Sequence, residues 1–97
     1  MRVIAKRTLR EFWEQHTDAQ PALEEWHLIA EKADWQNPND ITNGVPNARY
    51  LGNDRFLFKI KGNHYRLIVK VNFAHQIVYI RFVGTHAQYD KIDATTI

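Results

Sequence analysis

The spacing of apolar residues changes along the chain from a helical repeat to an alternation. A short β-branched start over residues 2–5 predicts a first strand. Thr8, followed by a glutamate three residues later, has the spacing of a capping box and predicts the start of a helix. Pro21 favours the first turn of a second helix, which is expected to start after Asp18 or Gln20. Because few residues separate these helices, we expect a helical hairpin that covers an apolar surface.

The same pattern predicts the buried face of each helix. The apolar residues at helical spacing are Leu9, Phe12 and Trp13 in the first helix, and Ala22, Trp26, Ile29, Ala30 and Ala33 in the second. The next stretch, residues 37–54, is rich in Asn, Pro, Gly and Asp, which are the usual turn formers. We expect a long loop there, and long loops in small domains are often functional.

From Arg55 onward the apolar residues alternate, which predicts three strands joined as a meander. The strands are expected over residues 55–61, 64–72 and 76–84. Gly62 and Asn63 form a glycine-first turn between the first two, suited to a type II′ hairpin. The order β-α-α-β-β-β predicts an α+β fold in a single domain, residues 1–97, with an antiparallel sheet and the helical hairpin on one of its faces.

The register of the predicted hairpin places positive charge on the opposite face of the sheet. Residues that flank a two-residue turn are cross-strand partners, and partners point to the same face. Lys59 therefore lies opposite Arg66, and a four-residue turn before Ile77 puts Arg81 opposite Ile68. The cations expected on this face are Arg55, Lys59, Lys61, Arg66, Lys70 and Arg81.

The positive charges on this basic, concave face repel one another, so a negatively charged partner is expected. Like charges at partner positions cost on the order of tenths of a kcal/mol per pair, and no acid is predicted on the same face. A carboxylate ligand or a phosphate backbone would supply charge-assisted hydrogen bonds, so the sequence predicts an open anion-binding sheet with nucleic acid as the favoured ligand. The alternative is that these side chains only solubilise the outer face of the sheet.

Composition and net charge narrow the class of protein. A hydrophobic content of 44% excludes a disordered chain. A formal net charge of +2 permits an anionic partner without requiring one, so the position of the cations decides whether such a partner is expected.

There is no cysteine, and the five histidines show no paired ligand spacing, so neither a disulfide nor a metal site is expected. The absence of an apolar signal or membrane-spanning stretch predicts a soluble, cytoplasmic protein without a membrane partner.

The segment "VGTHAQYDKI" after the last strand carries candidate chemistry near one end of the basic face. Histidine gives or takes a proton near neutral pH, and a neighbouring Tyr or Lys can donate to a phosphate oxygen. His86, Tyr89 and Lys91 are therefore candidates for phosphate chemistry. The alternative is that His86 packs under the loop or caps a turn.

Four stretches of the chain, "LREFWEQHTDA", "EEWHLIAEKADW", "DRFLFKIKGNHYRLIVKVNF" and "GTHAQYDKI", resemble the HigB family of toxins from type II toxin–antitoxin modules, within the RelE-like superfamily of ribonucleases. The resemblance covers nearly the whole chain. It implies a RelE-like fold and an endoribonuclease without metal or cofactor, which cuts mRNA, commonly on the translating ribosome. It also implies a HigA-type helix-turn-helix antitoxin that forms a hetero-oligomer with the toxin and connects it to operator DNA.

The resemblance also locates the site. It implies catalytic roles for basic residues of the second and third strands and for residues after the last strand, namely Lys59, Lys61, Arg66, His86 and Tyr89. The residues expected to bind RNA around them are Arg55, Asn63, His64, Lys70, Arg81 and Lys91. We expect the 2′-hydroxyl of the RNA to be the nucleophile, with Arg66 and Lys61 stabilising the phosphorane. His86 is one proton-transfer partner and Lys59 or Tyr89 the other, and relatives outside this branch often have Arg at the position of His86, so acid and base stay unassigned.

Two other classes of protein remain open. A non-catalytic RNA-binding module would use the basic face but would have no use for His86. A protein-interaction domain would present Trp13, Trp26 or Trp35 to a partner, although Trp13 and Trp26 stand on the apolar helix faces and are expected in the core. In the toxin class, the antitoxin either covers the site or acts at a distance from it, and the sequence favours neither.

Overall fold

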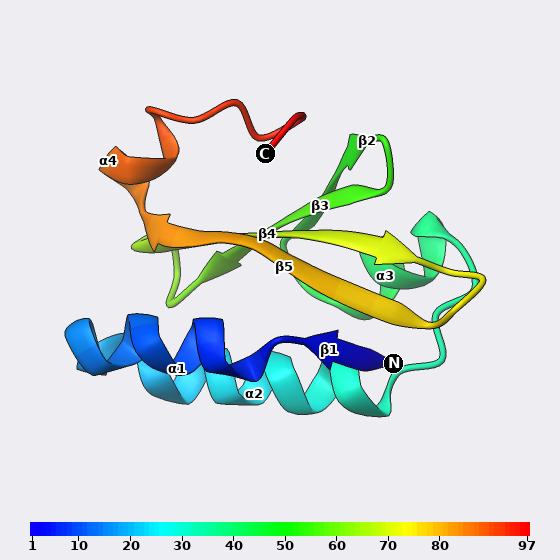
Figure 1. Cartoon of the computed structure of the whole chain (residues 1–97), viewed down its shortest axis with the longest axis horizontal. Helices are drawn as coiled ribbons and strands as arrows, with labels where there is room; N and C mark the ends of the chain where they lie inside the picture. The colour runs from blue at the N-terminus through cyan, green and yellow to red at the C-terminus, as the bar shows by residue number, and fades with distance from the viewer.

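The computed structural model describes residues 1–97 and contains one five-stranded sheet. Helices α1 (Lys6–Gln15) and α2 (Gln20–Lys32) lie side by side on one face, and the chain after the last strand, including the short helix α4 (His86–Tyr89), crosses the other face (Figure 1). The strands are β1 (Arg2–Ile4), β2 (Ala48–Gly52), β3 (Arg55–Ile60), β4 (Tyr65–Asn72) and β5 (Ile77–Thr85). The predicted α+β class and helical hairpin are confirmed, and no helix has the length and apolarity needed to span a bilayer.

The sheet is mixed, whereas the sequence predicted an antiparallel one. The strand order is β1-β5-β4-β3-β2, and β3, β4 and β5 form the predicted antiparallel meander. β1 pairs with β5 in parallel, with Arg2 opposite Ile77 and Ile4 opposite Tyr79. A three-residue strand has no side-chain pattern that fixes its direction, so the tertiary structure alone decides this pairing.

Helix α1 begins earlier than predicted. It starts at Lys6, so Thr8 lies in its first turn and makes no side-chain cap. The predicted capping box is wrong because Ala5, and not Thr8, is the N-cap. Glu11 instead pairs with Arg7, with 2.8 Å between Arg7 Nε and Glu11 Oε1. The apolar side of the helix packs into the core as expected, through Leu9, Phe12 and Trp13.

Helix α2 follows a 3₁₀ turn, η1 (Thr17–Ala19), which leaves neither Asp18 nor Gln20 as its N-cap. Pro21 lies in the first turn, as predicted. The buried face is rotated relative to the prediction, because Ile29 is 39% exposed. The buried residues of the helix are Leu23, Trp26, His27 and Ala30.

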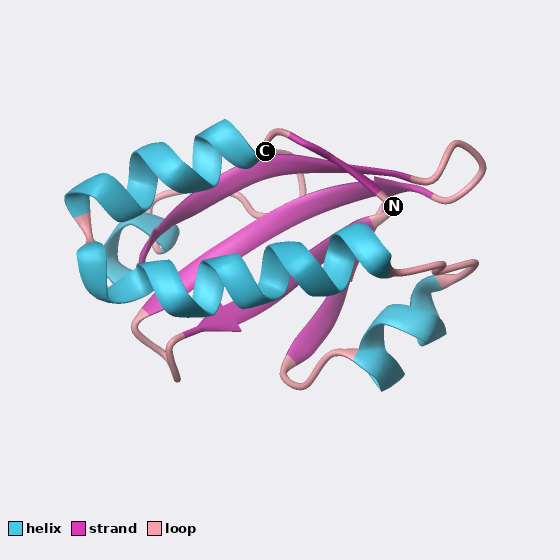
Figure 2. Cartoon of the chain, turned by 90° about the horizontal axis from the view of Figure 1, so that it is seen from below, coloured by secondary structure: helices cyan, strands magenta, loops and turns pink.

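The predicted loop over residues 37–54 is wrong, because it contains a helix and a strand. Asn37 accepts a hydrogen bond from the Asp40 amide (3.0 Å) and thereby caps α3 (Pro38–Gly44). α3 lies beside the edge strand β2 (Figure 2), which pairs with β3. A tight turn with positive φ follows β2 at Gly52, Asn53 and Asp54. The same residue types that make turns therefore cap a helix and end a strand here.

The predicted register between β3 and β4 is confirmed. Lys59 pairs with Arg66, and Gly62 has the positive φ (+63°) that the first central position of a type II′ turn requires. The pairing ends at Ile60 and Tyr65, one residue earlier on each strand than predicted. The residues around the turn are therefore free of the sheet.

A β-bulge in β5 changes the register predicted for β4 and β5. Ile68 pairs with Phe82 and not with Arg81, because Arg81 is the extra residue of the bulge. The pairing of Lys70 with Tyr79, on the other side of the bulge, is as predicted. The bulge therefore adds Phe82 to the face that the sequence assigned to cations.

The hydrophobic core lies between the sheet and helices α1 and α2. It is one cluster of 18 buried residues that includes Trp13, Trp26 and Trp35. The interpretation of these tryptophans as a partner surface is therefore not supported. Leu57 and Ile68 are also buried but lie outside this cluster, on the opposite face of the sheet. Something other than the helices must cover them.

Candidate functional site

The sheet face opposite the helices, which we call the tail-side face, is partly covered by residues 90–97 (Figure 1). Arg55 is only 6% exposed there, and its Nε donates to the Ile97 carbonyl at 2.9 Å. Arg81 Nε donates to the same oxygen at 3.3 Å. The expectation of an open basic face is therefore wrong at its centre, where two of the cations hold the C-terminal segment in place.

The C-terminal segment also brings an acid onto this face. The Asp93 carboxylate accepts hydrogen bonds from the Thr95 hydroxyl (2.6 Å) and amide (3.0 Å), and these bonds lower its pKa. The positive charge of Arg55 lowers the pKa of Asp93 further. The prediction that no acid shares the face is thus wrong, because an irregular segment supplies one.

One end of the tail-side face remains open as a cleft of about 290 Å³, which we call the Arg66 cleft. Its walls come from the start of β2, from β3, β4 and α4, and consist of Asn47, Ala48, Arg49, Leu57, Lys59, Arg66 and Tyr89. Three of the predicted catalytic residues, Lys59, Arg66 and Tyr89, meet in this cleft. They come from three elements that are separate in sequence.

Arg66 is the buried cation of the cleft, with 6% exposure. Its Nη1 donates to the side-chain oxygen of Asn63, and its guanidinium carbon lies 5.6 Å from the centre of the Tyr89 ring. Its Nε is buried without any hydrogen-bond partner. A buried donor without an acceptor costs about 1–3 kcal/mol of stability, and more when the donor is charged. An anionic ligand in the cleft would supply an acceptor for the guanidinium.

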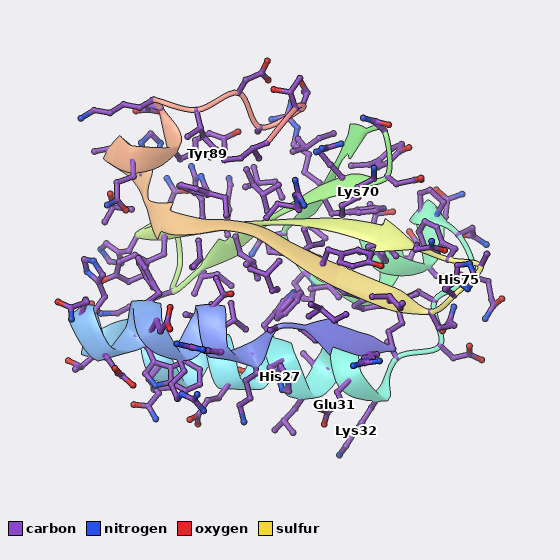
Figure 3. All side chains as sticks on the ribbon, in the orientation of Figure 1. His27, Glu31, Lys32, Lys70, His75 and Tyr89 are labelled. Atoms are coloured by element: carbon purple, nitrogen blue, oxygen red, sulfur yellow. The ribbon has the colours of Figure 1, made fainter.

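Tyr89 reaches the cleft because α4 turns the chain back over the sheet directly after β5. Thr85 and Gln88 close a capping box, in which the Gln88 amide donates to the Thr85 hydroxyl (3.2 Å) and the Thr85 amide to the Gln88 side chain (2.9 Å). Gly84 leaves the room for this turn, since a Cβ there would lie 2.5 Å from the Phe82 ring and 2.7 Å from Gln88 Oε1. Figure 3 shows Tyr89 between α4 and the sheet.

His86 lies at the rim of the cleft and is not part of its wall. It is the first residue of α4 and its side chain is half exposed. Its Nδ1 lies 3.2 Å from Asp90 Oδ2, and its ring centre lies 6.4 Å from that of Tyr89. The carboxylate orients the imidazole through Nδ1, which leaves Nε2 free for a ligand.

Lys61 does not share the tail-side face, contrary to the prediction. It lies in the β3–β4 turn with φ of +51°, and its Nζ pairs with Asp18 Oδ2 at 2.7 Å. The Tyr65 hydroxyl donates to the other oxygen of Asp18 at 2.5 Å. The hydrogen bond from Lys61, followed by that from Tyr65, lowers the pKa of Asp18 from 3.8 to about 2, and the hydrogen bond to Asp18 raises the pKa of Tyr65.

The other residues predicted to contact RNA are spread over three places. Asn63 and His64 are exposed in the β3–β4 turn, and Asn63 contacts Arg66 from there. Lys70 and Arg81 line a second cavity at the far end of the tail-side face. Lys91 is exposed just after α4. The predicted set therefore does not form one continuous surface.

Sequence reasoning missed Arg49 and Asn47, which both fell in the predicted loop. Arg49 pairs with Leu57 across β2 and β3, so its side chain shares the tail-side face with Lys59. It is exposed and has no carboxylate partner. The alternation in "ARYLG" directly before the turn residues "ND" was the signal that could have revealed this strand.

The cleft has the chemistry of an anion-binding site next to a proton-transfer group. Two exposed cations, Arg49 and Lys59, stand beside the buried Arg66, and Tyr89 offers a hydroxyl and an aromatic face. His86 lies outside this wall, with its ring centre 6.4 Å from that of Tyr89. No group of three or more His, Cys, Asp or Glu side chains is arranged to hold a metal ion. The structure thus defines a small α+β protein with a basic cleft on the sheet face opposite its helices.

Comparison with known proteins identifies the family. Residues 19–92 match the HigB toxin family, the RelE-like toxic component of a toxin–antitoxin system, and the chain belongs to this family. It is 24% identical over 95 residues to the mRNA interferase HigB of Escherichia coli O6:H1, which covers 95% of this chain and 91% of that protein. It is 28% identical over 97 residues to the mRNA interferase toxin HigB of Escherichia coli K12, with 97% and 92% covered, and equally to the mRNA interferase HigB of Shigella flexneri. The family and the RelE-like fold implied by the resemblance are confirmed. Because the family is the toxic component of a toxin–antitoxin system, the partner of this chain is an antitoxin.

Proposed function

We propose that this chain is an mRNA interferase, an endoribonuclease that cuts mRNA in the Arg66 cleft and thereby inhibits translation and growth. The observation that supports this most is the gathering of Lys59, Arg66 and Tyr89 in one cleft, with a buried Arg66 Nε that lacks an acceptor. The names of the relatives in Escherichia coli and Shigella flexneri point to the same activity.

In the proposed reaction the RNA supplies its own nucleophile. The 2′-hydroxyl gives up its proton and attacks the adjacent phosphorus, and the bond from phosphorus to the 5′-oxygen breaks as that oxygen takes up a proton. Arg66 stabilises the charge on the phosphorane, and the exposed Arg49 and Lys59 neutralise the neighbouring phosphates. Lys61 is left out of this set because it is paired with Asp18 outside the cleft.

His86 is proposed as one of the two proton-transfer groups, because its Nε2 is free and its ring is oriented by Asp90. Tyr89 or Lys59 is the other, since both line the cleft. The geometry leaves open which group acts as acid and which as base. The proposed partners are a HigA-type helix-turn-helix antitoxin and mRNA on the translating ribosome, and the proposed location is the cytoplasm.

The first test compares Arg66→Ala and His86→Ala with the unchanged chain. We expect Arg66→Ala to lower the cleavage rate by about 10²–10³-fold and His86→Ala by about 10²–10⁴-fold, because the first removes charge stabilisation and the second a proton-transfer group. The measurement is growth after induction, together with mapping of new 5′ ends on translating ribosomes. Arg10→Ala, which removes an exposed cation of α1, is the matched control and should remain toxic. If both cleft variants stay fully active, the proposed site is wrong.

A substrate with hydrogen in place of the 2′-hydroxyl at the cut position tests the nucleophile. We expect it to bind but not to be cleaved. The same experiment separates the enzyme from a non-catalytic RNA-binding module, since a module that only binds RNA produces no new 5′ ends from the unmodified substrate.

A further inference from the structure

A second cavity lies at the other end of the tail-side face. It has a volume of about 620 Å³, twice that of the Arg66 cleft, and opens near the β2–β3 turn and the β4–β5 hairpin. Its polar lining residues are Asp54, Lys70, Asn72, Tyr79 and Arg81. Figure 3 shows Lys70 on the same side of the sheet as Tyr89 but far along it. The proposed cleavage step uses none of the residues in this cavity.

Two cations of this cavity are available to a ligand. Lys70 has neither a carboxylate nor a hydrogen-bond partner. Arg81 uses only its Nε, on the Ile97 carbonyl, which leaves its terminal N–H groups free. Asn72 is already engaged, because its side-chain oxygen accepts the His75 amide at 2.9 Å. The free donors thus suit a phosphate group.

The remaining lining residues fit a nucleobase better than a free anion. Tyr79 is the cross-strand partner of Lys70, so the two side chains leave the sheet on the same face and both line the cavity, and Phe73 adds an apolar wall. The exposed carboxylate of Asp54 would repel a free phosphate but can accept a hydrogen bond from a base amino group. A nucleotide carries both a phosphate and a base, and aromatic rings beside cations are typical of sites for single-stranded nucleic acid.

We propose that this cavity is a second RNA site, which holds one nucleotide of the strand whose scissile phosphate lies in the Arg66 cleft. The proposal rests on the proposed function. Along β4, Arg66 of the cleft and Lys70 of the second cavity are four residues apart, about 13 Å at the usual rise per residue, a span that a short single strand bridges. The C-terminal segment covers Arg55, the cross-strand partner of Lys70, so the RNA passes over that segment and is held at both ends.

The test uses the full chain and two RNAs, a trinucleotide and a hexanucleotide, with 2′-O-methyl ribose throughout so that no cleavage can occur. We expect the hexanucleotide to bind more tightly and to shift the amide NMR signals of Lys70 and Tyr79, which the trinucleotide and inorganic phosphate leave in place. Tyr79→Leu should weaken hexanucleotide binding by about tenfold, whereas Tyr79→Phe should not, since a phenyl ring still stacks on a base.

Lys70→Ala should weaken hexanucleotide binding as well, and Arg10→Ala on α1 is the matched control. If Tyr79→Leu fails to fold, Lys70→Ala alone tests the proposal, because Lys70 has no partner whose loss would disturb the fold. Equal affinity of the two RNAs, an unchanged affinity in Lys70→Ala, or an equal response to inorganic phosphate would overturn the second site while leaving cleavage in the Arg66 cleft intact. Conversely, if Lys70→Ala weakens hexanucleotide binding but the unchanged chain cuts no mRNA, the second site stands and the proposed function fails.

Discussion

Arg66 is held in place from two directions before any ligand arrives. Asn63 accepts a hydrogen bond from its Nη1, and the Tyr89 ring lies next to the guanidinium. The planar fork of arginine makes such fixation effective, because one bond and one stacked ring determine where the remaining N–H groups point. Asn63 thus acts as a positioning residue for Arg66, in addition to any contact with RNA that its exposed position in the turn allows.

We therefore expect Asn63→Ala to lower the cleavage rate by about 10- to 100-fold, because a displaced guanidinium stabilises the phosphorane less well. The loss should appear in kcat more than in KM, since the cation itself remains. His64→Ala, in the same turn, is the control and should keep the unchanged kcat, because the only hydrogen bond of the His64 ring is with the Lys61 carbonyl and not with Arg66. An effect confined to KM, or an equal loss in both variants, would contradict the positioning role.

At the scale of elements, Asp18 joins the helical hairpin to the β3–β4 turn. Its carboxylate accepts hydrogen bonds from Lys61 and Tyr65, which hold the turn that carries Asn63. The pKa of Asp18 is about 2 in the folded chain, below its ordinary value of 3.8. A depressed pKa means that the ionised form stabilises the fold above the ordinary pKa and that this stability is lost as the pH falls through the folded pKa.

Asp18→Asn should accordingly be less stable than the unchanged chain at neutral pH, and the difference should shrink as the pH falls from about 4 to about 2. Urea unfolding over this pH range measures it. The variant should also bring the pKa of Tyr65 down toward its ordinary value, which ultraviolet titration of the phenol detects. Glu14→Gln, which changes an exposed acid of α1 without a partner, is the control and should leave both quantities unaltered.

The elements that could be predicted from sequence are those with a local signal. The alternation from Arg55 onward fixed three strands and the register of Lys59 with Arg66, because side-chain period and turn length determine both. The helix and strand within residues 37–54 were missed because Asn, Pro, Gly and Asp favour helix caps and turns alike. The direction of β1 and the course of residues 90–97 depend on contacts between distant segments, which no local pattern records.

The candidate site shows the same division. Lys59, Arg66 and Tyr89 were found because strand parity and position after the last strand bring them together. Lys61 was misplaced because the pairing ends before it and its positive φ turns it away toward Asp18. Arg49 was missed together with its strand. The burial of Arg55 was not predictable, since its partners are backbone oxygens of an irregular segment.

At the scale of the whole molecule, a small net charge hides a strong asymmetry. Residues 48–85 contain seven Lys and Arg against one acid, Asp54, whereas the two long helices carry charges of both signs. Lys61 is paired with Asp18 away from the tail-side face, and Arg55 and Arg81 donate to the Ile97 carbonyl. The cations of this face with neither a carboxylate nor a C-terminal partner are Arg49, Lys59, Arg66 and Lys70. The electrostatic potential is therefore more positive over the tail-side face than over the helices, and a polyanion should approach the tail-side face.

This distribution predicts how binding of single-stranded RNA depends on salt. Each phosphate contact contributes a slope of about −0.7 to the logarithm of the binding constant against the logarithm of salt concentration, so four contacts give about −3. Lys59→Gln should make the slope shallower by about 0.7, because one contact is lost, and Arg10→Gln on α1 should not change it. Fluorescence anisotropy with a labelled, uncleavable RNA measures both slopes. If the two variants changed the slope equally, the RNA would be responding to net charge alone and not to the cations that the sheet places on its tail-side face.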